Sequence, residues 1–72
     1  MNVEQVIELV EKYIADPKSV SYEELRAAAA ATYAVATWFA WNTTVHATAA
    51  ALNGDIDDAK YWVAKYHKNH NV

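Results

Sequence analysis

The stretch from Ser21 to Asn53 constrains the fold more than any other part of this chain. It holds no charged residue after Arg26, no glycine and no proline, and it is rich in alanine, the residue with the highest intrinsic helix propensity. Ser21 and Glu24 have the spacing of a capping box at a helix start, and Gly54 can end a helix in a left-handed conformation. We therefore predict one long central helix over about residues 21–53, roughly 48 Å in length.

Large apolar side chains point in all directions around this predicted helix. Successive residues of a helix step by about 100°, which spreads the tyrosine, tryptophan, phenylalanine and valine side chains around most of its circumference. A helix that is apolar all round must be covered by protein or by lipid. We predict that two or more copies pair through it, in a dimer or a larger even-numbered assembly. The residues expected at this self-association contact are Trp38, Phe39, Trp41, Asn42, Val45 and His46.

Two shorter helices are predicted on either side of the central one. Asn2 can cap a first helix whose apolar residues recur every three to four positions, and Pro17 should end it near Ala15. Asp55 can cap a last helix that carries two further acids in its first turn and lysines toward its end. The expected ranges are about 3–15 and 55–68.

The predicted fold is all-α, with three helices in a single domain over residues 1–72. Short connections place each flanking helix antiparallel to the half of the long helix that it joins. One side of the long helix would then remain bare, and this gives a second reason to expect a helical-bundle oligomer.

Composition and charge narrow the classes of function. The chain has no cysteine, which suits a reducing compartment, and acids interrupt the start of the chain, so we expect no secretory signal and a cytoplasmic location. The net charge is −3, and only six basic residues are scattered along 72 positions. Binding to DNA or RNA needs clustered lysine and arginine, so a nucleic-acid partner is not expected.

Neither a metal site nor an active site is expected. His67 and His70 lie three residues apart, but the spacing fixes no third ligand, and the nearby aspartates are better explained as helix caps. His46 has no serine, cysteine or aspartate placed by the sequence to work with it. Three helices in so short a chain also rarely enclose a cleft. The prediction is a non-enzymatic protein without a cofactor.

Aromatic rings and lysines occur together in two places and mark a candidate ligand or partner contact. Flat rings beside ammonium groups are the chemistry that holds a nucleobase and its phosphate, although amphipathic aromatics also occupy subunit interfaces. The residues of this candidate contact are Tyr13, Lys18, Tyr61, Lys65 and Tyr66. A sponge-like oligomer that binds a small nucleotide is therefore an alternative function.

A membrane-associated helix is a further alternative. The uncharged stretch is long enough to span a bilayer. It also contains threonine, asparagine and histidine among its alanines, and alanine contributes little to membrane insertion. A membrane partner therefore ranks below a protein partner.

The alanine-, tyrosine- and tryptophan-rich helix and the following segment Asp-Ala-Lys-Tyr-Trp-Val-Ala-Lys-Tyr-His, residues 58–67, resemble small helical accessory proteins of tailed bacteriophages. The resemblance covers residues 22–67 and lies mainly in composition. It implies a host-directed protein that binds and inhibits or sequesters a host protein. This non-enzymatic binding role is the expected function.

Overall fold

The computed structural model describes residues 1–35 and 38–70, except for the side chains of residues 35, 38–40 and 70. Its elements are α1 (Val3–Ala15), a short 3₁₀ turn η1 (Pro17–Ser19), α2 (Tyr22–Val35), α3 (Trp38–Leu52) and α4 (Ile56–His70). The described residues contain no strand. The all-α prediction is confirmed, and α1 ends at Ala15 as the following proline predicts.

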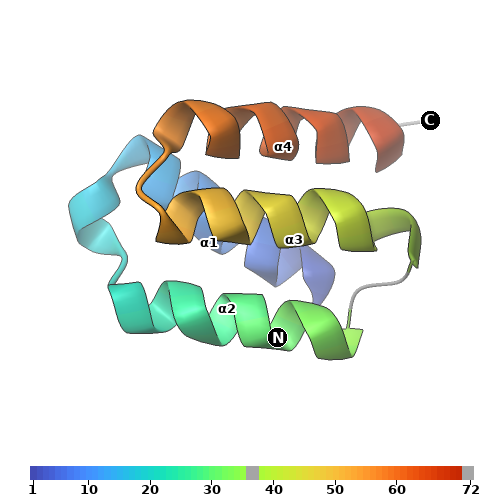
Figure 1. Ribbon diagram of the computed structural model, residues 1–72, viewed down its shortest axis with the longest axis horizontal. Coiled ribbons are helices and arrows are strands. Elements are labelled where there is room, and N and C mark those ends of the chain that lie inside the picture. Colours follow the sequence, from blue (N-terminus) through green and yellow to red (C-terminus); the bar gives the residue numbers. More distant parts are fainter. Residues whose placement is uncertain (36–37, 71–72) are drawn as a thin grey trace.

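The predicted three-helix count is wrong, because the stretch 21–53 forms two helices, α2 and α3, instead of one. The two helices pack against each other in opposite directions (Figure 1). A single helix of about 48 Å would leave much of its apolar surface uncovered in so short a chain. Folding the stretch back on itself lets α2 and α3 cover one another. Residues 36 and 37, between the two helices, lie outside the described part.

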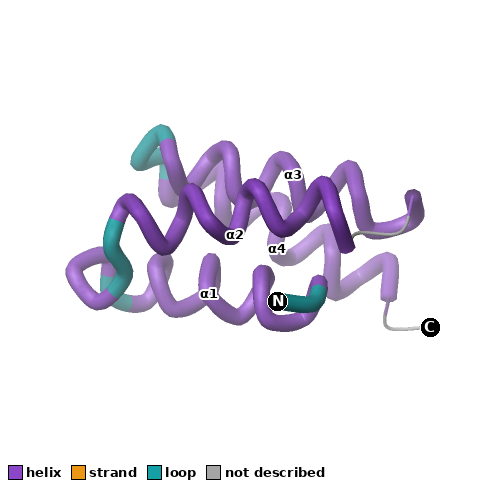
Figure 2. Tube along the Cα trace, turned by 90° about the horizontal axis from the view of Figure 1, so that it is seen from below, coloured by secondary structure: helices purple, strands orange, loops and turns teal. Residues whose placement is uncertain are grey.

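The four helices of the described residues form an up-and-down bundle. Figure 1 shows α3 in front of α1, with α4 and α2 on either side of this pair, and Figure 2 gives the same order from below. Contacts link α1 and α3 to each other and to both outer helices. The bundle is therefore flattened, with α1 and α3 across its short diagonal, and measures 32 × 23 × 16 Å.

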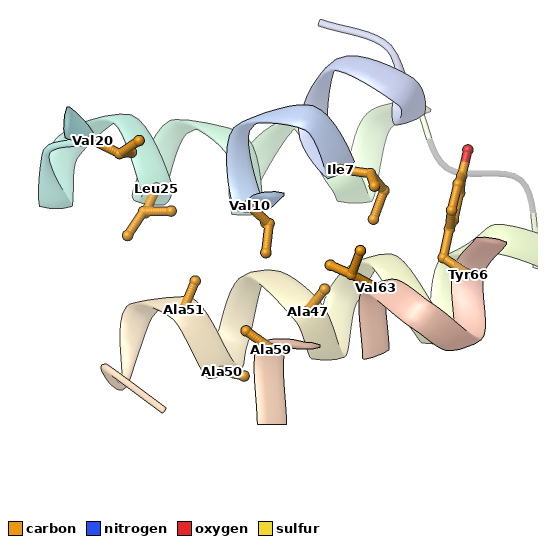
Figure 3. Packing of buried hydrophobic residues seen from close by; sticks show 10 residues of the cluster. All are labelled: Ile7, Val10, Val20, Leu25, Ala47, Ala50, Ala51, Ala59, Val63 and Tyr66. Atoms are coloured by element: carbon orange, nitrogen blue, oxygen red, sulfur yellow. The ribbon is translucent and has the colours of Figure 1, made fainter. Parts of the chain in front are cut away.

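The buried side of α3 consists of small side chains, whereas α1 supplies branched ones. In α1, Val6, Ile7 and Val10 are fully or almost fully buried. Figure 3 shows Val10 pointing between Ala47 and Ala51 of α3, and Ile7 pointing toward Val63 of α4. Bulky residues of one helix thus fill the space that the small residues of the other leave open. Among the side chains of α3 that the structure describes, residues 41–52, the buried ones are Thr43, Thr44, Ala47, Thr48, Ala50 and Ala51.

Two capping boxes start the first two helices where the sequence predicts them. The backbone N–H of Gln5 donates to Asn2 Oδ1, and that of Asn2 donates to Gln5 Oε1, both at 2.8 Å. In the second box the N–H of Glu24 donates to Ser21 Oγ at 3.1 Å, and the N–H of Ser21 donates to Glu24 Oε1 at 3.0 Å. Each box satisfies two backbone donors that a helix start leaves free.

In the turn between α3 and α4, Asp55 both helps to end α3 and caps the start of α4. Gly54 has φ +73°, its N–H donates to the Ala51 carbonyl, and the Asp55 N–H donates to the Ala50 carbonyl at 2.9 Å. These are the two hydrogen bonds of a Schellman motif. Asp55 Oδ1 then accepts from the N–H of Asp58 at 3.1 Å and caps α4. Three residues therefore suffice to reverse the chain.

Buried threonines bring hydroxyl groups into the core. Thr32 Oγ1 donates to the Ala28 carbonyl at 2.9 Å, and Thr48 Oγ1 lies 3.1 Å and 3.0 Å from the carbonyl oxygens of Thr44 and Val45. The fully buried Thr44 differs, since its hydroxyl has no hydrogen-bond partner among the described residues. An unpaired buried hydroxyl lowers stability because it has lost its contact with water.

Replacing Thr44 with Val should raise the free energy of unfolding by about 1 kcal/mol, because a methyl group takes the place of the unpaired hydroxyl. Thr48→Val is the matched control and should lower it by about 1 kcal/mol, because that hydroxyl is hydrogen-bonded. Urea unfolding at one protein concentration measures both. A Thr44→Val variant that loses as much stability as Thr48→Val would contradict the assignment.

Glu24 should make the second capping box sensitive to pH. The hydrogen bonds from the Ser21 backbone N–H and then from the Ser21 side chain hold the pKa of Glu24 below its ordinary value of 4.5. A lowered folded-state pKa means that this stabilisation is complete above the unfolded pKa and is lost as the pH falls through the folded one. Glu24→Gln keeps the acceptor but does not titrate. Unfolding measured from pH 7 downward should therefore show a shallower acid loss in the variant, and identical slopes would contradict the prediction.

Candidate functional surfaces

The C-terminal half of α2 and the outward side of α3 carry a surface without charged residues, which we call the uncharged face. Tyr33 of α2 is 68% exposed and Trp41 of α3 is 43% exposed. Their rings meet edge to face across the two helices, with centroids 6.2 Å apart and planes at 66°. Aromatic pairs in this geometry attract one another beyond the effect of burial. The face consists of Tyr33, Trp41, Asn42, Val45 and Ala49.

The residues predicted for self-association lie on the outward side of α3 wherever their side chains are described. Trp41, Asn42 and His46 are exposed, and Val45 is partly buried. They point outward because the other side of the helix holds the small core residues. The side chains of Trp38 and Phe39 lie outside the described part. Sequence reasoning missed Tyr33, since its position beside Trp41 follows only from the reversal of the chain between α2 and α3.

A second group of side chains, the aromatic–lysine cluster, lies where α4 packs on α3. The ring of His46 stacks on that of Trp62, with centroids 4.4 Å apart and planes at 17°. Tyr61 lies 5.0 Å from Trp62, and Lys65 Nζ is 5.7 Å from the Tyr61 centroid and 5.6 Å from the Trp62 centroid. The cluster joins the two helices and leaves Tyr61 half exposed.

The outer side of α4 is hollowed next to this cluster. The hollow is shallow and has a volume of about 370 Å³. It is lined by Tyr61, Ala64, Lys65, Lys68 and Asn69. An aromatic ring, two ammonium groups and an amide therefore meet at one place on the surface, which combines stacking, charge and hydrogen-bonding chemistry.

The remaining residues of the predicted ligand contact lie elsewhere. Tyr66 is 8% exposed and belongs to the core, where burial and then the nearby Glu4 and Glu11 carboxylates raise its pKa. Tyr13 packs against the core with its hydroxyl near Gly54. Lys18 is exposed in η1. The structure thus brings together Tyr61 and Lys65 and places Tyr13 and Lys18 near the connections of the bundle.

The metal-site and membrane-helix hypotheses concern His67, His70 and the apolar helices. His67 Nε2 lies 3.3 Å from Glu11 Oε2, which links α4 to α1 at the surface. Among the described residues, no three histidine, aspartate or glutamate side chains are grouped closely enough to hold a metal ion. The side chain of His70 lies outside that set. In the same part of the chain, none of the helices has the length and apolarity needed to cross a membrane.

Comparison with protein-family models, curated proteins and solved structures gives no match to this chain.

The stack of His46 on Trp62 should contribute to stability. Trp62→Ala should lower the free energy of unfolding by about 3 kcal/mol, because most of the tryptophan surface is buried and the ring packs against the core. His46→Ala combined with Trp62→Ala in a double-mutant cycle should give a coupling of about 0.5–1.5 kcal/mol. The control cycle pairs Trp62→Ala with Tyr22→Ala, at an exposed residue on another helix, and should give no coupling. Equal couplings in the two cycles would contradict a specific stack.

Proposed function

We propose that this chain is a small non-enzymatic binding protein that self-associates through the uncharged face and acts by binding, and so inhibiting or sequestering, another protein. The observation that carries the proposal is the edge-to-face pair of Tyr33 and Trp41, both exposed on a surface without charge. Tyrosine and tryptophan are the side chains that most often dominate the binding energy of protein interfaces. Charged residues are depleted at the centres of such interfaces.

A second copy of the chain is the occupant that fits the uncharged face. The protein has a net charge of −3, and the outward side of α1 carries Glu4, Glu8 and Glu11. A two-fold contact places the same patch of both copies together, so a charged patch would bring like charges close to one another. Two uncharged faces meet without that repulsion, and they bury the aromatic pair twice.

The reason for self-association differs from the one that the sequence suggested. The sequence argument relied on one long helix with a bare side, whereas the chain covers much of that stretch by folding it into α2 and α3. What supports self-association now is the small set of aromatic side chains that this packing leaves at the surface. The contact would extend along α3 through Val45 and Ala49, while the amide of Asn42 could set the register.

The proposed action on another protein takes its support from chemistry and composition. The exposed tyrosine and tryptophan rings of the chain belong to the side chains that most often dominate binding at protein interfaces. The compositional resemblance to bacteriophage accessory proteins suggests a host protein as the target, and a cytoplasmic site of action is part of the same proposal.

Light scattering at tens of micromolar should give a mass that is an even multiple of the 8.1 kDa monomer. Trp41→Glu should shift the mass to the monomer, because it places like charges opposite each other in a two-fold contact. Tyr61→Glu is the matched control, since it adds the same charge at an exposed aromatic residue on α4, and should leave the mass unchanged. A wild-type monomer across this concentration range would refute the assembly.

Affinity capture extends the test to the proposed partner. Immobilised wild-type protein should retain one protein from a bacterial lysate in a saturable manner, and added soluble wild-type protein should displace it. Retention that soluble wild-type protein cannot compete away would contradict the binding role.

A further inference from the structure

We infer that the hollow on the outer side of α4 is a binding site for a small nucleotide, a ligand with a planar ring and a phosphate group. This site is separate from the uncharged face and goes beyond the proposed self-association. It uses different residues, on a different helix, and it calls for a different ligand chemistry.

The two lysines of the hollow provide an unbalanced positive charge. Lys65 and Lys68 lie three residues apart on one helix, where like charges disfavour each other. No carboxylate of the described residues lies within ion-pair distance of either ammonium group. Glu11 lies instead 3.3 Å from His67 Nε2, on the side of α4 that faces α1. In a protein of net charge −3, two adjacent lysines without an acidic partner favour a bound anion.

Aromatic rings beside these lysines supply a stacking surface. Tyr61 is 50% exposed and lines the hollow, and Lys65 Nζ lies 5.7 Å from its centroid. His46 of α3 stacks on Trp62, which in turn lies beside Tyr61, so the cluster is held against α3. Base stacking on a tyrosine or tryptophan is worth about 1–3 kcal/mol. A nucleobase on Tyr61 would therefore place its phosphate within reach of Lys65.

Size and polarity also agree with a single nucleotide. The volume of about 370 Å³ lies in the range of small-ligand pockets, roughly 300–1,000 Å³. Asn69 adds an amide that can both donate to and accept from a base edge. Inorganic phosphate would engage the lysines without the ring, and a nucleoside would engage the ring without the lysines. Both parts of the ligand are therefore needed for full affinity.

Titration of the whole chain, followed by amide chemical shifts, tests the site. Adenosine monophosphate and uridine monophosphate should shift residues 61–69 in a saturable manner. Each should bind at least tenfold more tightly than inorganic phosphate or adenosine. Comparable binding of inorganic phosphate, or no saturable binding of either nucleotide, would refute the inference.

Three variants separate the contributions of charge and ring. Lys65→Gln combined with Lys68→Gln keeps much of the apolar stems and should weaken nucleotide binding at least tenfold, and Tyr61→Leu should do the same. Lys60→Gln removes an exposed lysine outside the hollow and should have no effect. Equal binding by all variants would place the nucleotide elsewhere.

The Trp41→Glu variant tests whether nucleotide binding is independent of self-association. Trp41→Glu should bind nucleotide like the wild type even as a monomer. Loss of nucleotide binding in this variant would overturn a site confined to one α4 helix. Failure of the wild type to self-associate leaves the expected nucleotide affinity unchanged.

Discussion

The small buried side of α3 is the constraint on which the rest of the structure depends. Its alanines and threonines keep their side-chain atoms close to the backbone, so α3 can pack on α1, α2 and α4 at once. The branched side chains of Val6, Ile7 and Val10 fill the space opposite. Larger residues on α3 would overpack this interface, at a typical cost of about 1–3 kcal/mol each.

The small buried side of α3 also determines which side chains lie at the surface. Because small residues occupy the inward side of α3, its described bulky residues Trp41 and His46 have to point outward. Trp41 then meets Tyr33 of α2, whereas His46 meets Trp62 of α4. The uncharged face and the aromatic–lysine cluster therefore lie on either side of the outward surface of α3, where it meets α2 and α4, and both follow from the way in which the core is filled.

Local signals in the sequence predicted the helix ends well, because each depends on a few neighbouring atoms. The capping boxes at Asn2 and Ser21, the stop before Pro17 and the left-handed Gly54 all appear where expected. The division of the stretch 21–53 was missed because alanine-rich sequence carries no local signal for it. Ending one helix and starting another leaves backbone C=O and N–H groups without partners inside a helix, so only the packing of α2 and α3 on each other and on the other helices can favour the division.

By itself, the sequence determined the all-α class, both ends of α1, the start of α2, the turn between α3 and α4 and the outward charge of α1, since propensity, capping and periodicity act within a few residues. It also identified Tyr61 and Lys65 as candidate contacts, because they combine a flat ring with a cation. The tertiary structure alone decided that Tyr33 meets Trp41, that His46 stacks on Trp62 and that Tyr66 is buried. Contacts between helices depend on how α1, α2, α3 and α4 pack into one core, and no local sequence pattern contains that information.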